Sequence, residues 1–137
     1  MKQSRRDLCF AAALMAALKA SAQEGAMKSR LFRFEDLAVR ANGENRSRAV
    51  LNGKTRSGFG VELHQTELAP GLAPHPPHSH VHEEMLLVRE GTMEVTIAGE
   101  TSTLGPGSVA YVASGEHHGW KNVGKTRAHY FVLTLGR

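Results

Sequence analysis

Apolar residues from position 58 onward come in short runs, and Gly or Pro ends almost every run. Runs of this length suit β-strands better than helices, which usually need ten residues or more. The predicted strands are Val61–Leu68, Glu83–Arg89, Thr92–Ala98, Glu100–Leu104, Ser108–Val112, His118–Val123 and Arg127–Leu135.

Period-two alternation supports this assignment. In residues 93–97, Met93, Val95 and Ile97 share one face of an extended chain, and Glu94 and Thr96 share the other. The pairs Glu90-Gly91 and Gly99-Glu100 are connections of hairpin size. Many short strands at near-regular spacing, with no long helical pattern, predict an all-β sandwich or barrel.

The chain has three predicted parts: residues 1–22, a strand or arm segment over 23–57, and a β domain over 58–137. A length of 137 residues allows one domain rather than two. The edges that an open β fold leaves exposed predict homodimerisation through strand edges.

Residues 1–22 have the layout of a cleaved export signal: a charged start, the apolar stretch 8–18, and the small residues Ala20-Ser21-Ala22. An uncleaved N-terminal helix is the alternative. The apolar stretch is too short to cross a bilayer, which takes about 20 residues, so no stable membrane anchor is expected. The run Ser4-Arg5-Arg6-Asp7-Leu8 resembles a twin-arginine signal, and the predicted location is periplasmic or secreted.

Charge and cysteine content limit the partners and the metal ligands that the chain can have. The leader holds four basic groups and one acidic group, whereas the rest of the chain has 13 basic and 12 acidic groups. The mature part therefore lacks the basic surface that nucleic acid requires, and no nucleic-acid partner is expected. The single cysteine, Cys9, lies in the leader, so a metal in the mature chain must use nitrogen and oxygen ligands.

The most informative stretch is residues 74–84, which is rich in histidine. On an extended chain, His78 and His80 point to the same side, and Glu84 has the same parity. Two imidazoles and one carboxylate aimed at one point can hold a first-row transition metal. A solvated His-rich loop is the alternative, and His82 could replace one ligand if the strand register differs.

Two ordered motifs resemble those of the cupin family. The first is Gly71, His78, His80, Glu84 and Gly91, with one extra residue between Gly71 and His78. The second is Gly107, Gly115, His118 and Asn122, with Ala113 where the family has Pro.

This resemblance implies a double-stranded β-helix, the cupin jelly-roll barrel, holding one internal metal. The implied ligands are His78, His80, Glu84 and His118. The donor types suit Fe, Mn, Ni, Cu or Zn as a divalent ion and do not choose among them.

Three functions are compatible with such a site. The first is a metal-dependent oxidoreductase of the dioxygenase kind acting on a small organic substrate, with Glu84 also accepting a proton. The second is a Lewis-acid isomerase or lyase. The third is a module that binds a small ligand or a metal without turnover.

Overall fold

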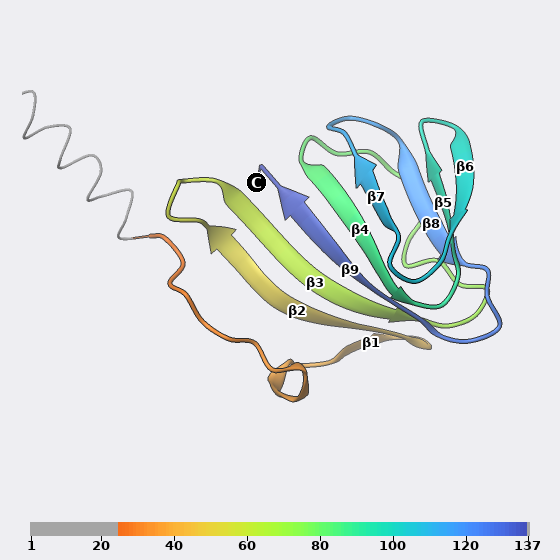
Figure 1. The fold of residues 1–137 in the computed structure, drawn as a ribbon, viewed down its shortest axis with the longest axis horizontal. Helices are drawn as coiled ribbons and strands as arrows, with labels where there is room; N and C mark the ends of the chain where they lie inside the picture. The colour runs from red at the N-terminus through yellow and green to blue at the C-terminus, as the bar shows by residue number, and fades with distance from the viewer. Residues whose placement is uncertain (1–24, 137) are drawn as a thin grey trace, which may run out of the picture.

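The computed structural model describes residues 25–136 and consists of two facing antiparallel β-sheets (Figure 1). The larger sheet has the strand order β1-β2-β3-β9-β4-β7, and the smaller has the order β6-β5-β8. The strands are β1 (Arg40–Asn42), β2 (Asn45–Lys54), β3 (Gly60–Leu68), β4 (Glu83–Glu90), β5 (Met93–Ile97), β6 (Glu100–Leu104), β7 (Val109–Val112), β8 (His118–Asn122) and β9 (Ala128–Leu135).

All seven predicted strands are present, each with ends within one residue of the prediction. The all-β jelly-roll fold class is therefore confirmed. Strands β9 and β4 are adjacent although far apart in sequence, with Tyr130 opposite Val88 and Val132 opposite Leu86. This long-range pairing closes the jelly roll.

The predicted export signal, residues 1–22, lies outside the described residues. Within residues 25–136, no helix has the length and apolar character needed to cross a membrane. The described N-terminal segment contains one short 3-10 turn, η1 (Phe34–Asp36).

Strand β2 lies in the segment that the sequence marked only as a strand or arm. It pairs along its length with β3 and has a bulge between Ala49 and Leu51. Its start, Asn45-Arg46-Ser47-Arg48, has no apolar alternation. Arg48 is buried because it forms an ion pair with Glu67 and lies over the Phe34 ring, 4.3 Å from its centroid.

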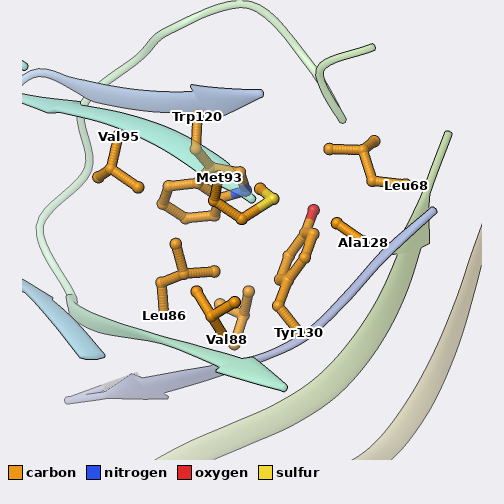
Figure 2. Packing of buried hydrophobic residues seen from close by; sticks show 9 residues of the cluster. Leu68, Leu86, Val88, Met93, Val95, Trp120, Ala128 and Tyr130 are labelled. Carbon is orange, nitrogen blue, oxygen red and sulfur yellow. The ribbon is translucent and has the colours of Figure 1, made fainter. Parts of the chain in front are cut away.

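The core lies between the two sheets (Figure 2). Leu86, Val88 and Tyr130 of the larger sheet face Met93 and Trp120 of the smaller one. The Tyr130 and Trp120 rings meet edge to face, with centroids 6.2 Å apart, and burial raises the pKa of Tyr130 to about 12. This apolar layer fills the space between the two sheets.

Candidate metal centre

The backbone places His78 opposite His118. Each residue donates its N–H to the carbonyl oxygen of the other, at 2.9 and 2.8 Å, which forms an isolated antiparallel bridge. Directly opposed residues in such a bridge carry side chains on the same face. The two imidazole centroids are accordingly 4.8 Å apart.

His78 and His80 lie in the connection between β3 and β4, and not on a strand as the sequence analysis assumed. Two contacts hold this connection against the turn before β8: Gly115 N–H donates to His80 O at 2.8 Å, and the Ser114 hydroxyl donates to Val81 O at 2.6 Å. The imidazoles therefore converge through loop packing, with His78 and His80 centroids 5.1 Å apart.

Gly119 allows this close packing. A Cβ at position 119 would lie 2.9 Å from Pro77 Cγ and 3.1 Å from Pro77 Cα. The absent side chain lets the Pro-rich connection cross β8 directly beside His118.

Glu84 reaches the same point from β4. Glu84 is opposite Val112 on β7 and Thr134 on β9, and it is buried, with 6% of its surface exposed. Glu84 Oε2 lies 2.6 Å from His80 Nε2 and 3.3 Å from His118 Nε2. A loop, β4 and β8 thus bring His78, His80, Glu84 and His118 together.

Two backbone carbonyls orient the imidazoles. His80 Nδ1–H donates to His82 O and His118 Nδ1–H donates to Glu116 O, both at 2.9 Å. Their Nε2 atoms then carry the lone pairs, and these face Glu84. Carbonyl contacts of this kind orient the imidazole ligands of metal sites.

The residues present fit a metal cation. His78 Nδ1 and His118 Nε2 are buried without a hydrogen-bond partner, although buried polar atoms normally have one. The His80 Nε2 lone pair also faces a carboxylate oxygen, so a proton or a cation is needed near them. Burial and the neighbouring histidines lower the pKa of His78, which favours the neutral form that a metal binds.

His82 remains an alternative ligand. Its ring stacks on His80 with centroids 3.6 Å apart, and His80, His82 and Glu84 form a second group close enough to hold a metal. The first group is His78, His80 and His118. His80 belongs to both groups.

A hollow of about 300 Å³ opens on the inner face of β1, β2 and β3. Its lining includes Arg40, Ser47, Glu62, His64 and Thr66. Burial lowers the pKa of His64, while the nearby charges of Glu62 and Glu84 oppose that effect, so His64 lies within electrostatic range of the centre. No sequence signal singled out this group, because β1 and β2 bring part of it from outside the motifs.

Other polar and aromatic residues of this region lie outside the candidate ligand set. Asn122 is fully buried, and its side-chain amide donates to Leu68 O and Thr126 O. Trp120 packs in the core, whereas His117 is exposed. Tyr111 is on β7 opposite Met85, on the face of the sheet away from Glu84.

The family model for the cupin domain matches residues 64–134. The chain belongs to the cupin family. The match spans more than half of the chain and contains all four residues of the proposed ligand set. No curated protein matches this cupin significantly.

Solved structures show the same fold. KdgF from Halomonas sp. is 18% identical with a TM-score of 0.71, covering 80% of this chain and 96% of that one. TT1209 from Thermus thermophilus is 26% identical with a TM-score of 0.63, covering 80% of this chain and 99% of that one. The polyketide cyclase RemF from Streptomyces resistomycificus is 23% identical with a TM-score of 0.65, covering 81% of both chains.

Proposed function

We propose that this cupin is an exported, metal-dependent oxidoreductase of the dioxygenase kind that acts on a small organic substrate. The observation that carries the proposal is the convergence of three imidazoles and the buried carboxylate of Glu84 on one point, with two imidazole nitrogens left unpartnered. Export is proposed from the layout of residues 1–22.

A divalent transition metal would be held by the four donors His78, His80, His118 and Glu84. Two positions of an octahedral ion would then remain open. A bound redox-active metal would supply the electron transfer that O₂ chemistry needs. The hollow lies on the same inner face of the larger sheet as Glu84, and it would accommodate a small substrate inside the barrel.

Residues of the chain orient the metal donors and would accept the proton that the substrate loses. The carbonyl oxygens of His82 and Glu116 hold the lone pairs of His80 and His118 toward the centre. The carboxylate of Glu84 would accept the substrate proton. Val112, opposite Glu84 and fully buried, keeps water from that side.

A second candidate is Lewis-acid isomerase or lyase chemistry. The observation favouring it is the polar lining of the hollow, where Arg40 can bind an anionic substrate group and His64 and Glu62 can exchange protons. This chemistry consumes no O₂.

The first test is elemental analysis of the parent protein and of His80→Ala, His82→Ala and His118→Ala. We expect about one metal per chain in the parent and in His82→Ala, and loss of the metal in the other two variants. Retention in His118→Ala, or equal loss in all three, would contradict the proposed ligand set.

The second test measures O₂ uptake by protein loaded with Fe, Mn, Ni or Cu across phenolic and thiol substrates. We expect uptake that Glu84→Gln abolishes. Product formed equally well without O₂ would establish the Lewis-acid alternative, and a stoichiometric metal without any turnover would leave a binding module.

A further inference from the structure

Thr134 is a polar residue at an inward position of β9 that the alternation would give to the core. Tyr130, Val132 and Thr134 share one parity along the strand, and the first two belong to the apolar core between the sheets. Thr134 is buried with them, at 4% exposed. Within residues 25–136, its hydroxyl oxygen Oγ1 has no hydrogen-bond partner.

A buried hydroxyl without a partner destabilises a fold, because it has given up its hydrogen bonds to water. Valine has the same branched shape and would fill the position without this cost. Most buried polar atoms do have a partner, and the other unpartnered buried atoms include His78 Nδ1 and His118 Nε2 of the candidate metal centre. The hydroxyl of Thr134 therefore indicates a role beyond packing.

The strand register places Thr134 between two carboxylates. On one side it is opposite Glu84 of β4, and on the other it is opposite Glu62 of β3. Residues directly opposite each other share a face of the sheet, and their Cβ atoms are about 4.5–5.5 Å apart. The hydroxyl can therefore reach either carboxylate by a small side-chain adjustment.

Glu84 has the greater need of a donor from the protein. The Glu62 carboxylate lies 3.5 Å from His64 Nδ1, and the Glu62 side chain is 23% exposed, so water reaches it. The Glu84 side chain is only 8% exposed. Its cross-strand neighbour on β7 is Val112, which has no polar side-chain atom, so of the two residues directly opposite Glu84 only Thr134 can donate a hydrogen bond.

The two oxygens of Glu84 face different surroundings. Oε2 lies 2.6 Å from His80 Nε2 and 3.3 Å from His118 Nε2, so it is the oxygen on the imidazole side. Within the described residues, both contacts of the carboxylate with imidazole nitrogens use Oε2. Carboxylates that bind a metal are normally hydrogen-bonded by neighbouring groups as well. Oε1 is the oxygen that such a neighbour would hold.

We propose that Thr134 is a positioning residue for Glu84: its hydroxyl donates to Oε1 when a metal is bound, and Oε2 is the ligand. This inference rests on the metal centre of the proposed function. Because the hydroxyl holds Oε1, Glu84 uses one coordination position of the ion instead of two. Thr134 lies after both sequence motifs, which end at Gly91 and Asn122.

The test is a calorimetric titration of the full chain with Ni²⁺, an ion that this donor set suits. Thr134→Val removes the hydroxyl and keeps the branched shape. We expect it to weaken Ni²⁺ binding by about tenfold or more, as loss of a contact that orients a ligand does. Thr134→Ser keeps the hydroxyl, and we expect it to bind Ni²⁺ as the parent does.

Urea unfolding in the presence of a chelator is the second readout. We expect the midpoint of Thr134→Val to be no lower than that of the parent, because the hydroxyl has no partner to lose without a metal. Thr66→Val is the matched control for affinity. Thr66 is also buried on the inner face, but it is opposite Tyr130 and not Glu84, so this variant should keep the Ni²⁺ affinity of the parent.

The outcomes separate this inference from the proposed function. A parent that binds about one Ni²⁺ and a Thr134→Val variant of equal affinity would overturn the role of Thr134 and leave the metal centre standing. Equal losses of affinity in Thr134→Val and Thr134→Ser, or a lower urea midpoint in Thr134→Val, would show a packing role and overturn it as well. A parent that binds no Ni²⁺ would overturn the metal centre and this inference together.

Discussion

At the scale of single residues, the candidate site depends on contacts between backbone and side chain more than on the ligands alone. Carbonyl oxygens two residues from His80 and His118 set the orientation of their rings. The mutual backbone bridge of His78 and His118 sets their separation. The sequence motifs identified the four donors, whereas none of these orienting contacts has a side-chain signature in the sequence.

Gly119 provides a prediction at this scale. In Gly119→Ala the new methyl group would press on Pro77, and the displaced loop would carry His78 away from His118. We expect a stability loss of about 1–3 kcal/mol, as for other overpacked sites, and metal binding weaker by about tenfold or more, as when contacts that orient ligands are lost.

The measurements are chemical denaturation and metal titration. Gly105→Ala is the matched control, because a Cβ at position 105 has nothing within 4 Å. Gly119→Ala with the metal affinity of the parent would show that the contact with Pro77 does not position His78.

At the scale of elements, the seven strands of residues 58–137 were predictable because each is a short apolar run between Gly or Pro breakers. Strand β2 was not. Its buried position 48 is held by an ion pair and a cation–π contact, and neither leaves an apolar pattern in the sequence. Strand β2 in turn supplies Ser47 to the hollow on the inner face of the larger sheet.

The ion pair between Arg48 and Glu67 gives a prediction for the β2–β3 hairpin. The hydrogen bond from Arg48 holds the pKa of Glu67 below its usual value of 4.5. A carboxylate with a lowered pKa in the folded state stabilises the fold above pH 4.5, and this stabilisation is lost as the pH falls through the folded-state pKa. We expect Arg48→Met to cost about 1.5–3 kcal/mol at pH 7, the range for hydrogen bonds to charged groups.

The free energy of unfolding of parent and variant, measured between pH 7 and pH 3, checks this expectation. The difference in the free energy of unfolding between parent and variant should become smaller as the pH approaches 3. Arg46→Met is the control: Arg46 is 55% exposed and 4.0 Å from Glu67, and its loss should cost no more than about 0.5 kcal/mol. A gap that does not change with pH would mean that Arg48 stabilises β2 by packing alone.

At the scale of the whole molecule, a bound metal would join parts of the chain that are far apart in sequence. The ligand set comes from the β3–β4 connection, β4 of the larger sheet and β8 of the smaller sheet. A metal that binds all of them resists separation of the two sheets. Binding to the folded chain alone therefore stabilises the whole fold.

We expect metal at 100 times its dissociation constant to stabilise the protein by about 2.7 kcal/mol. For a domain of this size, that corresponds to a rise in Tm of roughly 10 °C. Thermal unfolding with a chelator and with added metal measures the rise in Tm. In His118→Ala the added metal should raise the Tm only slightly. An equal shift in His118→Ala would indicate binding by the group of His80, His82 and Glu84.

The sequence by itself determined the all-β class and the strand positions after residue 58, and its resemblance to the two cupin motifs implied the jelly roll and the donor residues of the candidate centre. These are local properties, since periodicity, breakers and motif spacing act over a few residues. The tertiary structure decided that loop packing brings His78 and His80 together and that β2 extends the larger sheet. Each of these follows from pairing between distant segments, and the free energy of such pairing depends on which residues meet across the sheets.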